Sequence, residues 1–151
     1  MQQFLVFAAI VFGVAAFGSL FPPDGWFAHL RKPSWNPPGW VFGPVWTTMY
    51  TFIALAGWLA YRRKEELCVA LVLWGSLLLL NGVWSYLFFG LHRPGLALIN
   101  MALQLITVVA CIAALTRLSF TATALMVPYA IWLIFTLLLN LSIYRLNRAT
   151  V

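Results

Sequence analysis

The sequence predicts an all-α integral membrane protein, a bundle of five transmembrane helices with a Trp- and Pro-rich loop between the first and second helices. Of its 151 residues, 64% are hydrophobic and only 8% are charged, whereas soluble domains carry about 25% charged residues. A soluble fold of this length could not cover so much apolar surface, so lipid must be its solvent. The long apolar stretches lack strict alternation, which excludes a transmembrane barrel.

Charged residues and prolines mark the boundaries of the five helices. The first helix has no charge and no basic segment before it, so we expect it to be retained rather than cleaved as a signal peptide. Pro44 is expected in the first turn of the second helix, and Pro128 is a residue type that can kink the fifth. The predicted helices are 4–21, 44–61, 67–89, 96–115 and 122–144, all in a single domain spanning 1–151.

The charged residues lie between the apolar stretches. The net charge is +6, but basic residues at helix ends anchor a bundle at the lipid headgroups, so no nucleic acid partner is expected. Four basic residues fall on the amino-terminal side and five on the other, which leaves the orientation open. These are Arg62, Arg63, Lys64 and Arg117 against Arg31, Lys32, Arg93, Arg145 and Arg148.

Few residues could carry ion or metal chemistry. The carboxylates, Asp24, Glu65 and Glu66, all fall in predicted loops, which argues against a proton- or cation-coupled exporter. The two histidines, His29 and His92, are also in loops and do not support a bis-histidine haem inside the bundle. Cys68 and Cys111 lack metal-like spacing and are interpreted as packing residues, so no metal site is expected.

The loop and the start of the second helix are unusually aromatic and stiff. The segment from Trp26 to Tyr50 contains four tryptophans, four prolines and two glycines. Tryptophan is costly to leave in water, and proline prevents a plain helix from forming. This segment should therefore form a defined surface over something beneath it.

Polar and aromatic residues recur at helical spacing within the predicted helices. They could be helix–helix hydrogen bonds, each worth about 1 kcal/mol or less. Their presence on four helices also fits an apolar pocket with a few polar points, suited to a flat hydrophobic ligand. The stripes are Trp46, Tyr50, Ala54, Gly57 and Tyr61; Asn81, Trp84, Ser85 and Phe88; Asn100, Gln104, Thr107 and Cys111; and Tyr129, Trp132, Thr136, Asn140 and Tyr144.

Three stretches of this sequence resemble the TspO family of tryptophan-rich sensory proteins, which is related to the mitochondrial translocator protein, or peripheral benzodiazepine receptor. The main one is W-F-x-x-L-x-K-P-S-W-N-P-P-G-W-V-F-G-P-V-W-T-x-x-Y, from Trp26 to Tyr50. The others are Leu80-Asn81-x-x-Trp84-Ser85 with Phe88-Phe89-Gly90, and Pro128-Tyr129-x-x-Trp132 with Phe135-Thr136 and Leu139-Asn140. The five-helix count also agrees with that family.

The resemblance implies a homodimeric five-helix bundle that binds porphyrins such as protoporphyrin IX and haem. It further implies that the protein binds isoquinoline- and benzodiazepine-type drugs, and that animal members of the family bind sterol. A cofactor is not obligatory, because porphyrin or haem is the ligand. The implied cavity lies beneath the first loop, in a bacterial cell membrane or outer membrane. Its lining residues, transferred by motif, are Trp26, Phe27, Pro38, Trp46, Tyr50, Asn81, Trp84, Ser85, Trp132 and Thr136.

Two departures narrow this implication. Many relatives carry a carboxylate where this chain has Asn100, and the tyrosine of the animal cholesterol motif aligns with Leu141. A bacterial-type tetrapyrrole binder that transports, sequesters or senses porphyrin is therefore favoured. We expect Asn81 and the indoles of Trp46 and Trp132 to donate hydrogen bonds, with His29, Arg31 or Lys32 meeting the propionates.

Three alternatives remain at this point. The first is light-dependent porphyrin degradation, not conventional enzyme catalysis, in which Trp46 and Trp132 correspond to the family's tryptophans linked to porphyrin chemistry. The second is a cholesterol- or lipid-binding protein of the translocator type. The third is a scaffold protein whose pocket is only a packing feature. Gly75 and Gly82 on the third helix could support either dimerisation or intramolecular packing.

Overall fold

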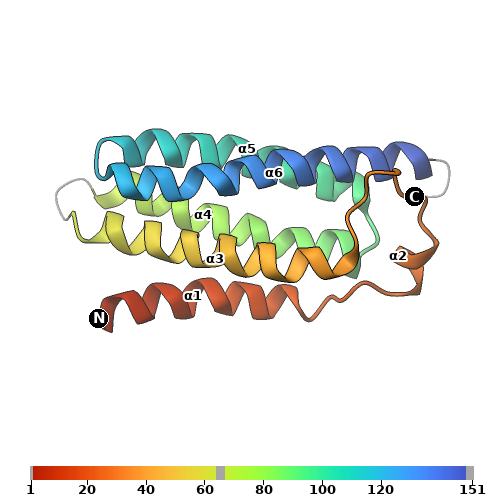
Figure 1. The fold of residues 1–151 in the computed structure, drawn as a ribbon, viewed down its shortest axis with the longest axis horizontal. Coiled ribbons are helices and arrows are strands. Elements are labelled where there is room, and N and C mark those ends of the chain that lie inside the picture. Colours follow the sequence, from red (N-terminus) through yellow and green to blue (C-terminus); the bar gives the residue numbers. More distant parts are fainter. Residues whose placement is uncertain (1, 64–66, 149–151) are drawn as a thin grey trace.

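The computed structural model describes residues 2–63 and 67–148, and most of these residues are helical, with no strand among them (Figure 1). The long helices are joined by short connections, apart from the segment between the first two. That segment contains a single short helix. In chain order the elements are α1 (Gln2–Gly18), α2 (Gly25–His29), α3 (Gly39–Tyr61), α4 (Leu67–Ser85), its π-helical continuation η1 (Tyr86–Gly90), α5 (Pro94–Thr116) and α6 (Phe120–Asn147).

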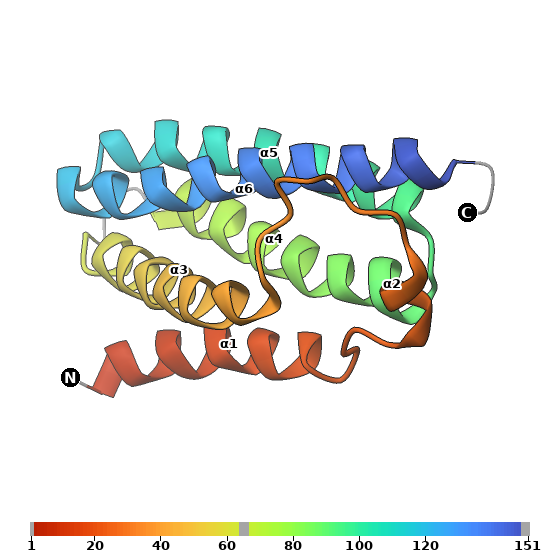
Figure 2. The ribbon, with the colours of Figure 1, turned by 45° about the vertical axis from the view of Figure 1, so that its right-hand side comes forward.

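The long helices lie side by side and alternate in direction, so α1 begins at one end of the bundle and α6 finishes at the other (Figures 1 and 2). Helix α1 packs on α3 and α4, α5 packs between α4 and α6, and α3 also packs on α6. The loop containing α2 lies at the end where α6 finishes. It rises from α2 to α6 and then returns to the start of α3 (Figure 2).

Three helices among the described residues are long and apolar enough to cross a membrane, Val69–Gly90, Pro94–Thr116 and Phe120–Asn147. Helix α1 is apolar but shorter, with 17 residues. Helix α3 has 23 residues, but its tryptophans, tyrosines and threonines lower its hydropathy. By length and hydropathy, the described residues therefore support three of the five crossings that the sequence predicts.

Several predicted boundaries differ from the structure. Helix α3 begins at Gly39 rather than at 44, so Pro44 lies inside the helix and not in its first turn. The helix starts early because Pro38, with φ −57° and ψ 143°, supplies the extended residue before it. Helix α5 begins at Pro94 rather than at 96, with this proline in its first turn. The predicted loop position of Lys64–Glu66 lies outside the described residues, as does the packing of Cys68.

The bundle's core depends on one glycine at a helix crossing. A Cβ atom at Gly57 of α3 would lie 2.6 Å from a ring carbon of Trp74 and 2.9 Å from one of Phe7. The missing side chain lets the indole of Trp74 reach α3, where its N–H donates a 2.9 Å hydrogen bond to the carbonyl of Ile53. Helices α1, α3 and α4 can therefore pack this closely because Gly57 has no side chain.

Candidate functional site

The short helix α2 is capped at both ends by side chains of its own loop. Asp24 accepts a 3.1 Å hydrogen bond from the backbone N–H of Phe27. Lys32 donates from Nζ to the carbonyls of Phe27 at 2.6 Å and Leu30 at 3.2 Å. A carboxylate at the start and an ammonium at the end of a helix both oppose the helix dipole. The ammonium of Lys32 is thus engaged within the loop, contrary to its expected role at the propionates.

The loop is also joined to the connection between α4 and α5. His92 Nε2 lies 3.0 Å from Asp24 Oδ2, and the His92 ring stacks on Trp26 with centroids 4.3 Å apart. The hydrogen bond from Phe27 is the main reason that the pKa of Asp24 lies below its ordinary value, and His92 lowers this pKa further. His92 reaches this position from a left-handed backbone conformation, φ 55°. Asp24 and His92 therefore hold α2 against the helices beneath it.

A cluster of rings lies beneath α2. Trp26 and Phe27 both contact Phe88, with centroids 5.8 and 6.0 Å apart. Trp84 stacks on Phe88 at 5.2 Å from one helical turn away. Leu30 is buried in the same cluster. The structure thus brings Trp26, Phe27 and Trp84 together as predicted, and it adds Phe88, which the sequence placed on the same stripe as Asn81.

A second group of rings joins α3 to α6. Trp46 stacks on Tyr50 at 5.4 Å and meets Trp132 edge-on, with centroids 6.3 Å apart. Trp132 stacks on Phe135 at 5.1 Å. Phe135 in turn meets Trp35 of the loop at 5.7 Å. Trp46, Tyr50 and Trp132 are therefore neighbours, as the stripes predicted.

Residues Trp35, Phe42 and Phe135 complete these walls but were not among the predicted lining residues. Phe42 meets Trp132 edge-on at 6.0 Å. Trp35 belongs to the aromatic motif, and Phe135 lies three residues after Trp132, so helical spacing from that tryptophan could have identified it. Phe42 could not be found in this way because the sequence placed it in the loop, not in α3.

A chain of hydrogen bonds crosses the bundle behind Trp46. The hydroxyl of Tyr50 donates to Asn81 Oδ1 at 2.8 Å, and Asn81 Nδ2 donates to the hydroxyl of Tyr129 at 3.1 Å. Tyr129 donates to Gln104 Oε1 at 3.4 Å, and Gln104 Nε2 donates to Asn100 Oδ1 at 2.7 Å. Four helices are joined by one directed chain. Both polar groups of Asn81 are engaged in it, although Asn81 is expected from the sequence to donate to the ligand.

The remaining predicted residues lie apart from the rings or are engaged locally. The hydroxyl of Thr136 donates to the carbonyl of Trp132 at 2.9 Å. Pro38 is exposed and precedes α3. A Cβ atom at Gly18 of α1 would lie 3.1 Å from Ser85 Oγ, so Ser85 faces the contact between α1 and α4. The structure does not bring Ser85 to the ring clusters.

Three buried polar atoms among the described residues have no hydrogen-bond partner: Trp84 Nε1, Trp132 Nε1 and Asn140 Oδ1. The amide nitrogen of Asn140 donates only to the sulfur of Met101, at 3.4 Å. An unsatisfied buried donor or acceptor costs about 1–3 kcal/mol. The two indoles belong to the ring clusters described above. Donors left unpaired there are able to bind acceptor atoms of a ligand.

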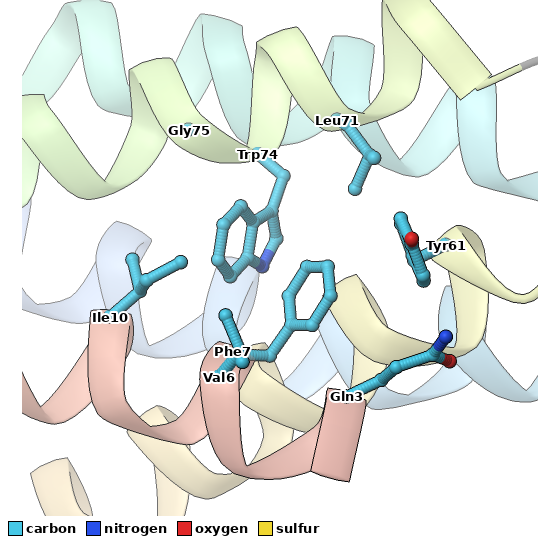
Figure 3. Close-up of a pocket in the computed structure, with 8 residues that line it drawn as sticks. All are labelled: Gln3, Val6, Phe7, Ile10, Tyr61, Leu71, Trp74 and Gly75. Atoms are coloured by element: carbon cyan, nitrogen blue, oxygen red, sulfur yellow. The ribbon is translucent and has the colours of Figure 1, made fainter.

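A hollow of about 410 Å³ lies at the opposite end of the bundle, between α1, α3 and α4 (Figure 3). The rings of Phe7, Tyr61 and Trp74 form its wall, beside Gly75 (Figure 3). None of the predicted ligand-binding residues lines it. Among the described residues there is also no group of three or more His, Cys, Asp or Glu side chains that could hold a metal ion.

Comparison with known proteins identifies the family of this chain. The model of the TspO/MBR family matches residues 5–145. The tryptophan-rich protein TspO of Chlorobaculum tepidum is 39% identical over 140 residues, which cover 86% of each chain. The human translocator protein is 38% identical over 81% of this chain and 75% of its own length. The tryptophan-rich sensory protein of Cereibacter sphaeroides is 37% identical over 95% of this chain and 90% of its own.

The match spans α2 to α5 completely and includes most of α1 and α6, so it covers both ring clusters and the loop above them. The apolar helices and this match together establish a membrane protein. The chain belongs to the TspO/MBR family.

Proposed function

We propose that this protein binds a tetrapyrrole, protoporphyrin IX or haem, between the loop of α2 and the ring clusters, and thereby transports, sequesters or senses porphyrin. The observation that carries the proposal is the pair of buried, unpaired indole N–H groups of Trp84 and Trp132. A tetrapyrrole offers a flat aromatic face for the rings and carboxylate or carbonyl oxygens for the donors. Isoquinoline- and benzodiazepine-type drugs and sterols would compete for the same walls.

The proposal includes five membrane crossings, with α1 and α3 added to the three long apolar helices. It also includes a homodimer in a bacterial cell membrane or outer membrane. Gly82 packs against another helix of the same protomer, since a Cβ atom there would lie 3.4 Å from Val14 of α1. Gly75 has no such neighbour within 4 Å. Gly75 is therefore the member of this pair that is available for contact with a second copy.

Titration of protoporphyrin IX into purified protein tests the binding site through quenching of tryptophan fluorescence. Replacement of either indole by a phenyl ring keeps an aromatic wall but removes the N–H. We expect Trp84→Phe and Trp132→Phe each to weaken binding about tenfold, which corresponds to about 1.4 kcal/mol. Trp40→Phe is the matched control, because Trp40 is 76% exposed. Equal affinities in all three variants would refute the site.

Photochemical degradation of the bound porphyrin is the second candidate function. It is favoured by the stacking of Trp46 on Tyr50 at 5.4 Å and its contact with Trp132 at 6.3 Å. Light-excited porphyrin would take one electron from the indole of Trp46, and the porphyrin radical anion would pass that electron to dissolved dioxygen, giving superoxide as the oxidant that attacks the ring. Illumination of the complex should then bleach the porphyrin faster than in Trp46→Phe. Bleaching at the rate of free porphyrin would exclude this activity.

A further inference from the structure

A single side chain at the end of α6 holds the backbone of the loop. The N–H of Arg31 donates to Asn147 Oδ1 at 2.9 Å, and Asn147 Nδ2 donates to the carbonyl of Arg31, also at 2.9 Å. Paired residues of an antiparallel sheet exchange the same two bonds. The amide of Asn147 therefore binds the loop as a neighbouring strand would.

The side chain of Asn147 is fixed before it meets the loop. Its Nδ2 also donates to the carbonyl of Ile143, one turn earlier in α6, at 2.7 Å. Asn147 is only 7% exposed. Loss of a hydrogen bond at a buried group costs about 1–3 kcal/mol, so release of Arg31, which removes the N–H that Asn147 Oδ1 accepts, is opposed.

The residue next to Arg31 enters the ring cluster. Leu30 is 8% exposed and packs in one cluster with Phe88, Leu139 and Ile143. Trp26, Phe27 and Trp84 border that cluster. The bond pair at Arg31 thus fixes the backbone one residue away from Leu30, where the loop meets the ring cluster.

We propose that Asn147 is a positioning residue that keeps the loop closed and so sets the rate at which a ligand leaves. The inference rests on the proposed function for the ligand, although the bond pair itself does not depend on it. A ligand between the loop and the rings leaves when the segment around Arg31 lifts away from α6. Asn147 contacts no ligand atom in this scheme and acts only through the loop.

The Asn147→Asp variant distinguishes loss of the bond pair at Arg31 from a general loss of stability. The protonated carboxylic acid has the shape of the amide and can both accept from and donate to Arg31. The carboxylate can only accept, and it repels the Arg31 carbonyl. We expect protoporphyrin IX to dissociate about tenfold faster from Asn147→Asp than from the wild type at neutral pH, with a smaller change in the association rate. Acidification should restore the wild-type rate.

The charged groups around this position are Arg31 from the loop, Arg145 from α6 and Arg148 just after it, all exposed. These positive charges stabilise the carboxylate of the Asn147→Asp variant. The pH at which the wild-type dissociation rate returns is therefore read from a pH titration of that variant. Arg148→Gln is the matched control, because it makes the same change in net charge one residue away. The dissociation rate of the wild type is measured over the same pH range, so that any effect of the contact between Asp24 and His92 can be subtracted.

A measurement without ligand separates this proposal from the proposed function. The protection of the Arg31 amide, measured as its exchange rate relative to the intrinsic rate at the same pH, should be lower in ligand-free Asn147→Asp than in Arg148→Gln at neutral pH, and acidification should restore it. If porphyrin fails to bind the wild type, the proposed function is refuted while the exchange result still tests the tether. Equal exchange in the two variants, or faster exchange with an unchanged dissociation rate, would overturn the role of Asn147.

Discussion

The hydroxyl of Tyr50 donates a 2.8 Å hydrogen bond to the side-chain oxygen of Asn81, which joins α3 to α4 inside the bundle. Asn81 is 6% exposed, and its amide nitrogen continues the chain to Tyr129 of α6. Tyr50 also carries the stacked ring of Trp46. This bond thus links the packing of three helices to the orientation of one wall of the proposed site.

Tyr50→Phe should destabilise the protein because it leaves Asn81 Oδ1 without its donor. Hydrogen bonds between membrane helices are worth about 0.6 kcal/mol on average and up to about 1.7 kcal/mol, so a loss of about 1 kcal/mol is expected. Thermal unfolding in detergent measures it. Tyr86→Phe is the control, since Tyr86 is exposed and its ring contact with Phe21 remains. Equal unfolding temperatures for the two variants would contradict a structural role for the bond.

Gly57→Ala should be the most damaging of the conservative glycine substitutions. The added methyl would lie 2.6 Å from the Trp74 ring and 2.9 Å from the Phe7 ring. Overpacking of this kind costs about 1–3 kcal/mol. Gly13→Ala, in α1, has no atom within 4 Å of the new methyl and should be neutral or slightly stabilising. Thermal unfolding of both variants compares them directly, and a Gly57→Ala protein as stable as Gly13→Ala would refute the close crossing.

Acidification should release the start of α2. The pKa of Asp24 is lowered from 3.8, first by the Phe27 N–H and then by His92. A lowered carboxyl pKa stabilises the folded state above the unfolded value, and this stabilisation is lost as the pH falls through the folded value. The protection of the Phe27 amide, measured as its exchange rate relative to the intrinsic rate at the same pH, should therefore be high near pH 6 and fall below about pH 4. Asp24→Asn should remove most of this pH dependence, and an unchanged profile in that variant would contradict the assignment.

Gly75→Leu should weaken self-association if the hollow beside Gly75 meets a second copy. Gly75 has no neighbour within 4 Å of an added Cβ, so a larger side chain is tolerated within one protomer but would separate two. Crosslinking in lipid bilayers should give less dimer for Gly75→Leu than for the wild type. Ile106→Ala, at an exposed position of α5, serves as the control. Full crosslinking of Gly75→Leu would place the dimer contact elsewhere.

The hydrophobic composition and the positions of the charged residues were sufficient to predict a helical membrane bundle. They determine which segments can be solvated by lipid, and that property depends on residue type alone. Helical spacing also identified Trp46, Tyr50, Asn81 and Trp132 as neighbours on facing stripes, because residues three or four apart share a face. The aromatic motif from Trp26 to Tyr50 identified the family, which the comparisons then confirmed.

The tertiary structure decided which polar groups are already paired. Asn81 and Lys32 were expected to meet a ligand, yet Asn81 bonds to Tyr50 and Tyr129, and Lys32 caps α2. Conversely, Trp84 and Trp132 keep unpaired donors, and Asn147, beyond the predicted end of its helix, binds Arg31. A sequence shows the hydrogen-bonding capacity of each side chain but not its partner, because the partner comes from a distant segment that only packing brings within reach.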